Sequence, residues 1–194
     1  MRDALTIVRA QEMSFERIAS PRTFRGIFAF LTLCFGVANA GTPQYIPKVD
    51  GKSLNGDVVH IPADVHGSSV ILIVGFTRKS GDQSRQWGLE LSQMKCADGK
   101  RVEWYGLPVL SDVPRLIRPL VLQGMRSGLT PEVRSRFVPI YSSSEAWKQS
   151  VHYSAPDDAN VALVSNTGQL KHLWHGVYDT EKGSQVRQSL CSAE

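Results

Sequence analysis

Cysteine is scarce in this sequence: only Cys34, Cys96 and Cys191 occur among 194 residues. None lies at residues 77–83, a polar, glycine-containing turn between a run of aliphatic residues and the next predicted helix. A thiolate there would be stabilised by the exposed N–H groups and the dipole of the helix. Ser80 cannot replace it, because a serine hydroxyl does no disulfide exchange. The absence excludes thiol chemistry at this turn.

Other signatures of catalysis are missing as well. The sequence has no Gly-x-Ser-x-Gly elbow for a serine nucleophile. His172 and His175 are three residues apart on a predicted strand, which puts them on opposite faces, so we expect no metal ion and no other cofactor. Asp157 and Asp158 could serve acid–base catalysis, but adjacent acids on such a loop are typical of a turn. We predict no catalytic residue, without excluding an enzyme.

A concentrated basic face is absent too. Of the 22 Lys and Arg residues, five lie in residues 1–40, as do three of the 18 Asp and Glu residues, which leaves a net charge of +2 for the rest of the chain. We expect Arg115, Arg118 and Arg126 to form the solvated side of one helix. Since nucleic-acid binding needs clustered basic side chains, no nucleic-acid partner is predicted.

No apolar run reaches the roughly 20 residues that a membrane span needs. The run at residues 27–38 follows Arg22 and Arg25 and precedes a small-x-small sequence that ends at Ala40. These are the three parts of a secretory signal. We expect cleavage after Ala40 and a periplasmic or secreted protein, with a mitochondrial presequence as the alternative.

Two details of this segment stay open. The polar lead is long for a signal, and a start at Met13 instead of Met1 would leave a more ordinary one. Cys34 lies midway through the apolar run, and Leu33 before it is not small, so we expect no lipid anchor. The predicted division is a signal with its polar lead at residues 1–40 and one domain at residues 41–194.

What the sequence does contain is an alternation of strand and helix patterns. Residues 70–76 are almost continuously apolar, as in a strand buried on both faces, and Asn55-Gly56 predicts a hairpin within residues 48–62. The other predicted elements are a helix at 84–96, a strand at 102–110, a helix after 111, a short helix or turn at 130–133, an extended piece at 137–141, a helix at 142–151, a hairpin at 160–176 and a helix at 179–191.

Two of these helices carry specific expectations. The helix after residue 111 has apolar side chains at spacings of three and four, which predicts a buried face. They are Leu116, Ile117, Leu120, Val121 and Met125. Ser142-x-x-Glu145 is a capping-box signature for the start of the helix at 142–151. The order of elements indicates an α/β three-layer sandwich, a mixed β-sheet with helices on both faces and an N-terminal β-hairpin.

This order resembles the thioredoxin-like superfamily. Residues 49–62 are similar to the N-terminal hairpin of its peroxiredoxin-type members, residues 70–76 to their first core strand and residues 161–176 to their terminal hairpin. A narrower resemblance covers about residues 103–176 and is carried by residues 116–126 and the hairpin at 163–176. It is to the thioredoxin-like assembly-factor family of the mitochondrial ATP synthase and its uncharacterised bacterial relatives.

The chain departs from the family at both redox positions. The turn has no cysteine, and Pro156 stands a few residues before the place of the family's cis-proline. The resemblance does imply that Cys96 and Cys191 lie close together, because the first core helix and the C-terminal helix of this fold share one side of the sheet and end at the pole opposite the active site. Export favours a structural disulfide; two unpaired thiols and a redox-active pair are the alternatives.

We expect residues 41–194 to form an exported, non-catalytic thioredoxin-like domain that binds another protein or a small ligand. The predicted binding residues surround the vacated turn and the loop that faces it: Arg78, Lys79, Ser80, Asp82, Asp157 and Asp158. One alternative is a thiol-disulfide oxidoreductase that uses a relocated Cys96/Cys191 pair. Another is an assembly factor or chaperone for a membrane complex, which, apart from the signal, would be the chain's link to a membrane.

Overall fold

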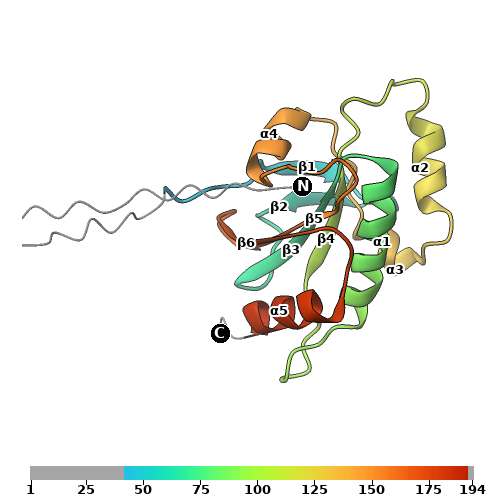
Figure 1. Ribbon diagram of the computed structural model, residues 1–194. Helices are drawn as coiled ribbons and strands as arrows, with labels where there is room; N and C mark the ends of the chain where they lie inside the picture. The colour runs from blue at the N-terminus through green and yellow to red at the C-terminus, as the bar shows by residue number, and fades with distance from the viewer. Residues whose placement is uncertain (1–41, 192–194) are drawn as a thin grey trace, which may run out of the picture. The chain divides into compact units, whose positions relative to one another are not determined.

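The computed structural model describes residues 42–191, which form a four-stranded mixed sheet, a two-stranded hairpin and five helices (Figure 1). In chain order the elements are β1 (Val49–Lys52), β2 (Val58–Ile61), β3 (Ser69–Gly75), α1 (Arg78–Gln93), β4 (Trp104–Pro108), α2 (Arg118–Arg126), α3 (Pro131–Arg134), α4 (Ser144–Ser150), β5 (Asn160–Ser165), β6 (Leu170–His175) and α5 (Thr180–Cys191). The sheet has the order β4-β3-β5-β6, with β3 and β4 parallel and the other pairs antiparallel. The predicted secretory signal lies outside the described residues. Within residues 42–191, no helix is both long and apolar enough to cross a membrane.

The strand β3 lies between β4 and β5, and its side chains enter two cores. Ile71 and Ile73 pack with residues of α1 and α5 on one face of the sheet. Val70, Leu72 and Val74 pack with α4 and the β1–β2 hairpin on the other face. All five side chains are fully buried, so the predicted strand that is buried on both faces is confirmed, as is the sandwich with helices on both faces.

The outer edge of β4 is covered by residues 137–141, the predicted extended piece. Gly106 and Val109 pair in parallel with Phe137 and Ile140. The close approach requires a glycine, because a Cβ at Gly106 would overlap the ring of Phe137. This short segment hydrogen-bonds to β4 and blunts an edge that would otherwise be open to another strand.

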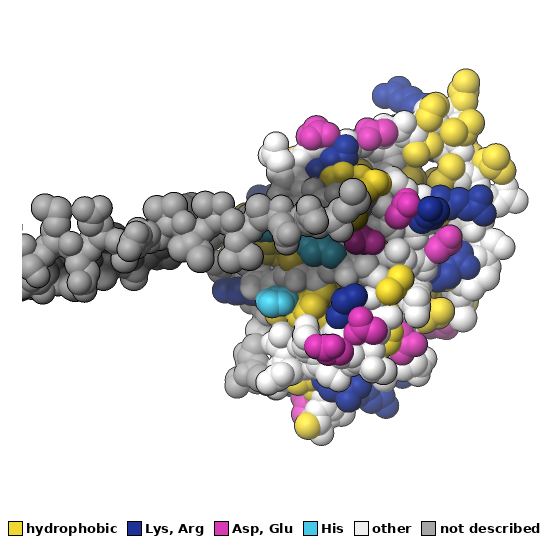
Figure 2. Space-filling view, in the orientation of Figure 1, with side chains coloured by type: hydrophobic (Ala, Val, Ile, Leu, Met, Phe, Trp, Pro, Cys, Tyr) yellow, Lys and Arg dark blue, Asp and Glu magenta, His cyan; other side chains and the backbone are white. Residues whose placement is uncertain are grey.

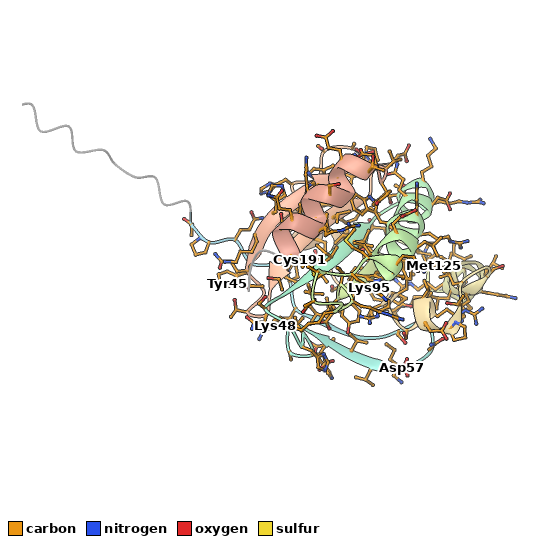
Figure 3. The ribbon with its side chains drawn as sticks, turned by 90° about the horizontal axis from the view of Figure 1, so that it is seen from below. Tyr45, Lys48, Asp57, Lys95, Met125 and Cys191 are labelled. Carbon is orange, nitrogen blue, oxygen red and sulfur yellow. A yellow bond between two sulfur atoms is a disulfide. The ribbon has the colours of Figure 1, made fainter. Side chains whose placement is uncertain are left out.

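A disulfide joins Cys96 to Cys191, with 5.5 Å between their Cα atoms. Cys96 follows the end of α1, and Cys191 is the last residue of α5. Figure 3 shows Cys191 next to Lys95, the neighbour of Cys96 in the chain. The predicted pairing of these two residues is confirmed.

The start of α1 differs from the prediction. The helix begins at Arg78 instead of residue 84, because Thr77 caps it: the Thr77 side chain accepts a hydrogen bond from the Ser80 N–H, and the Ser80 side chain accepts one from the Thr77 N–H. This reciprocal pair satisfies two N–H groups that the helix itself cannot. Residues 78–83, predicted as a turn, are the first turns of α1, and Gly81 is accommodated within them.

The predicted capping box at Ser142 and Glu145 is wrong. The N-cap of α4 is Ser143, and its side chain makes no capping hydrogen bond. Two other contacts replace the box: the Ser144 hydroxyl donates to the Asp112 carboxylate at 3.2 Å, and Glu145 pairs with Lys148 at 3.0 Å. A contact with the loop after β4 therefore accompanies a helix start one residue later than the local sequence indicates.

The helix α2 and the residues that lead into it are more exposed than predicted. None of its residues is buried, and Leu116, Ile117 and Leu120 are 95%, 49% and 70% exposed. Arginines bind the body of the domain instead: Arg118 donates to the carbonyl oxygens of Ser111 and Val113, and Arg126 Nε donates to the Leu54 carbonyl at 2.9 Å. The expected buried face is therefore wrong for Leu116, Ile117 and Leu120, whereas Met125 packs against the core. Of the arginines expected in solvent, Arg115 is exposed, and Arg118 and Arg126 bind carbonyls of the domain.

Candidate functional site

We call the end of the sheet where β3 runs into α1 the α1 pole. Ser80 lies on the inner side of this pole. Its side chain is buried, and its hydroxyl accepts hydrogen bonds from the N–H groups of Phe76 and Thr77, both at 2.9 Å, and donates to the Thr77 carbonyl at 3.0 Å. All the hydrogen-bonding capacity of this hydroxyl is used within the turn. Ser80 shapes the pole without presenting its hydroxyl to solvent.

The loop before β5 lies against this turn, as predicted. Thr77 Oγ1 donates to the Pro156 carbonyl at 3.1 Å, and Lys79 Nζ lies 3.0 Å from a carboxylate oxygen of Asp157. The N–H of Ala159 donates to Gln83 Oε1 at 2.9 Å. The Lys79–Asp157 pair is exposed, so it contributes at most about 1 kcal/mol to stability, but with the other bonds it holds the loop beside α1.

The remaining predicted binding residues separate into two groups. Arg78 and Asp82 are exposed on the first turns of α1 and line a cavity. Asp158 lies near the end of β6, with its carboxylate beside Gly176. The structure thus brings Lys79 and Asp157 together and places Arg78 and Asp82 on one rim, whereas Asp158 belongs to a different neighbourhood.

A cavity of about 760 Å³, here called the α1–α2 cavity, opens beside the pole. The first turns of α1 line one side through Arg78, Asp82 and Arg85, and α2 lines the other through Leu120, Val121 and Met125, the last of which is labelled in Figure 3. The parallel strands β3 and β4 end at Gly75 and Pro108, which also line it. Open α/β sheets bind ligands at the carboxyl ends of their strands, and the cavity lies at two such ends.

Sequence reasoning missed this cavity. It depends on α2 standing away from α1 while Arg85 spans the gap between them by donating to the Ser127 carbonyl at 3.2 Å. The sequence did contain one relevant signal, the apolar repeat that includes Val121 and Met125. This repeat indicates an apolar helix face, but it does not indicate which part of the domain that face lies against. The result is a cleft with apolar walls and charged groups on its α1 rim.

A second polar group, also missed, lies at the ends of β5 and β6. The buried Asn160 side chain donates through Nδ2 to the carbonyls of Val74 and Asp158, so its Oδ1 must accept from His175 Nδ1 at 3.0 Å. His175 therefore has its proton on Nδ1 and presents Nε2 as an acceptor. Burial lowers the pKa of His175 below its ordinary value; Asp158 opposes this effect, whereas His152 and Lys182 add to it.

We predict that His175 makes the domain less stable in acid. Its pKa is lower in the folded chain than the 6.5 expected on unfolding, so its contribution is complete above pH 6.5 and is lost as the pH falls below that value. In His175→Gln, urea midpoints measured from about pH 7.5 to about pH 5 should fall less than in the unchanged protein. His60, whose pKa is raised mainly by the hydrogen bond that its Nδ1 donates to the Asp50 carboxylate, acts in the opposite direction in both proteins. Equal slopes for the two proteins would contradict the prediction.

No metal-binding arrangement accompanies these groups. Within residues 42–191, no three His, Cys, Asp or Glu side chains come together in a way that could hold a metal ion.

Comparison with known proteins finds relatives by structure only. No family model and no curated protein matches the chain. Copper-bound yeast Sco1 is 16% identical, with a TM-score of 0.54 over 79% of this chain and 96% of Sco1. A thiol:disulfide interchange protein from Chlorobium tepidum is 12% identical, with a TM-score of 0.50 over 78% and 98% of the two chains. The exposed lipoprotein thioredoxin of Streptococcus pneumoniae is 11% identical, with a TM-score of 0.50 over 74% and 100%.

Identities this low establish the fold alone. The order of the strands, the helices on both faces and the N-terminal hairpin agree with these neighbours. The turn after β3, at residues 77–83, has no cysteine. The described part of the chain has a thioredoxin-like fold.

Proposed function

We propose that this thioredoxin-like domain is a non-catalytic module that binds a segment of another protein in the α1–α2 cavity. The observation that carries the proposal is the cavity itself: about 760 Å³, with apolar side chains on one wall and charged side chains on the other. It lies where the fold places the strand-to-helix turn, and no thiol is present there. Binding is the function that such a site can perform with the residues it has.

The composition of the walls favours a peptide segment as the ligand. Leu120 lines the cavity and is 70% exposed, so a partner that covered it would remove apolar surface from water. Across the cleft, Arg78 and Arg85 can donate to backbone carbonyls or carboxylates, and Asp82 can accept. Apolar surface with a few polar groups that fix orientation is the usual pattern of binding pockets.

Two finer parts of the proposal rest on the sequence. The similarity to the ATP synthase assembly factors covers residues 116–126, which contribute α2 and so one wall of the cavity. This overlap supports an assembly or chaperone role. Export is supported by the signal pattern and by the Cys96–Cys191 disulfide, since disulfides persist mainly in oxidising compartments.

Site-specific photo-crosslinking tests the proposal. A photoreactive residue at Val121, in the cavity, should capture a partner in the native compartment that the same residue at the exposed Val177 does not. Leu120→Asp should lower this capture about tenfold or more, because it replaces an apolar contact with a carboxylate that loses its water when the partner covers it. Arg78→Ala combined with Asp82→Ala should also lower it, and Val177→Asp is the matched control. Unchanged capture by both cavity variants would remove the proposal.

The Cys96–Cys191 pair supports a second candidate, the thiol-disulfide oxidoreductase. The two sulfurs are bonded, and both residues are partly exposed. A reductant could therefore reach them without unfolding the domain. This activity would lie at the far ends of α1 and α5, away from the α1–α2 cavity.

A further inference from the structure

The segment that leads into α2 exposes a group of apolar side chains that no described element covers. Leu116, Ile117 and Leu120, which we call the α2 ridge, are 95%, 49% and 70% exposed. In Figure 2, hydrophobic side chains gather over the position of α2, close to Lys and Arg side chains. Leu116 and Ile117 do not line the α1–α2 cavity, so the partner proposed for the cavity leaves them in water.

The segment that carries the ridge is basic, although the exposed Asp112 lies just before it. Residues 113–131 contain three arginines and no aspartate or glutamate. Arg115 is exposed next to Leu116, and Arg118 follows Ile117 in the chain while its side chain binds the Val113 carbonyl. This combination of leucine and isoleucine with flanking arginine is complementary to a surface that is apolar inside and anionic outside.

Several backbone polar groups near the ridge are hydrogen-bonded within the chain or are missing because the residue is proline. Pro114 and Pro119 have no N–H to satisfy. The N–H of Ile117 donates to the Pro114 carbonyl at 3.1 Å, and the side chain of Arg118 binds the Val113 carbonyl at 2.9 Å. Such internal partners lower the cost of moving these polar groups toward the hydrocarbon, which offers none.

We propose that the α2 ridge docks on the surface of an anionic lipid bilayer. Leu116 and Ile117 enter the region between headgroups and acyl chains, and Arg115 lies among the lipid phosphates. Leu120, which also lines the α1–α2 cavity, lies at the edge of this contact. Interfacial segments bind through this combination of buried apolar area and attraction to anionic lipid. The inference goes beyond the proposed protein-binding function and stands without it, and it adds a membrane contact that the sequence alone did not predict.

A fluorophore attached at the tip of the ridge tests the proposal. The full chain with Cys34→Ser and Leu116→Cys, kept oxidised so that Cys96 and Cys191 stay bonded, is labelled with an environment-sensitive dye. Vesicles of phosphatidylcholine with phosphatidylglycerol should shift its emission to the blue, and a quencher attached to the acyl chains should quench it. Pure phosphatidylcholine vesicles should do neither. Arg115→Gln should weaken the vesicle affinity about fivefold.

The matched control carries the dye at Val177→Cys, an exposed apolar position outside the ridge. Any membrane affinity of the apolar run at residues 27–38 is common to both labelled proteins, so the comparison between the two positions isolates the ridge. Equal quenching at the two positions would overturn the proposal, as would equal response to both lipid compositions. The proposal would also fail if the dye were shifted to the blue only after a partner protein had been crosslinked to the domain, and were not quenched from the bilayer. That result would show that a protein covers the ridge instead. Leu116 and Arg115 lie outside the cavity lining, so this result is independent of the Leu120→Asp crosslinking.

Discussion

Replacing Cys96 and Cys191 together by serine is expected to lower the free energy of unfolding by roughly 4 to 5 kcal/mol. The disulfide closes a loop with a sequence separation of 95, and a cross-link over so long a loop strongly restricts the unfolded chain. It also joins the ends of the two helices that cover one face of the sheet, so its loss frees α5 from α1. Urea denaturation of the oxidised protein and the double variant measures the difference directly.

The single variant Cys96→Ser provides the control, because it breaks the same bond and should lose about as much stability as the double variant. A difference below about 1 kcal/mol between oxidised and double-variant protein would show that residual structure in the unfolded state already limits the loop. Cys96→Ser also tests the oxidoreductase candidate, which requires thiol-dependent turnover that this variant abolishes.

The intact mass of protein recovered from its native compartment tests export: a chain that begins at Gly41 and resists alkylation until reduction is expected.

The fold could be predicted where the signal was local and strong. The apolar run at residues 70–76 became β3, and the turn around Asn166 joins β5 to β6 as expected. The disulfide followed from the family topology. The start of α1 was missed because Ser80, Gly81 and Asp82 are common in turns, and their composition hid the Thr77–Ser80 cap that begins the helix.

The helix α2 shows what periodicity leaves undetermined. The spacing of Leu116, Ile117 and Leu120 indicates one apolar side, but it does not say whether the domain has a surface to receive that side. The residues that pack on the core are Leu122 and Met125 instead, and Arg126 anchors the helix to the Leu54 carbonyl. Orientation was decided by long-range contacts, which no local pattern contains.

The candidate site was predictable to the same extent. The meeting of Lys79 with Asp157 follows from the topology, because the loop before β5 reaches the end of β3. The α1–α2 cavity and the Asn160–His175 hydrogen bond depend on how helices and strand ends pack, so the sequence did not indicate them. Arg78 and Asp82 were predicted as binding residues because they lie on the turn, and in the structure both line the α1–α2 cavity.

Trp87→Ala is expected to lower the free energy of unfolding by about 3 to 5 kcal/mol. Trp87 is fully buried between the sheet and its helices. Its ring stands edge-on to Tyr178 with 5.0 Å between the centroids, and its Nε1–H donates to the Gly176 carbonyl at 2.9 Å. Truncation would leave a cavity and remove the partner of that carbonyl. Thermal and urea unfolding measure the loss.

Trp87→Phe separates the two contributions, because phenylalanine keeps most of the ring contact and cannot donate to Gly176. A loss of about 1 to 3 kcal/mol, clearly smaller than that of Trp87→Ala, is expected for the missing hydrogen bond. Glu90→Ala, an exposed change on the same helix, should stay within about 0.5 kcal/mol of the unchanged protein. If Trp87→Phe lost as much as Trp87→Ala, the bond to Gly176 would outweigh the volume of the ring. The turn after β6, which follows His175, would then be fixed chiefly from α1.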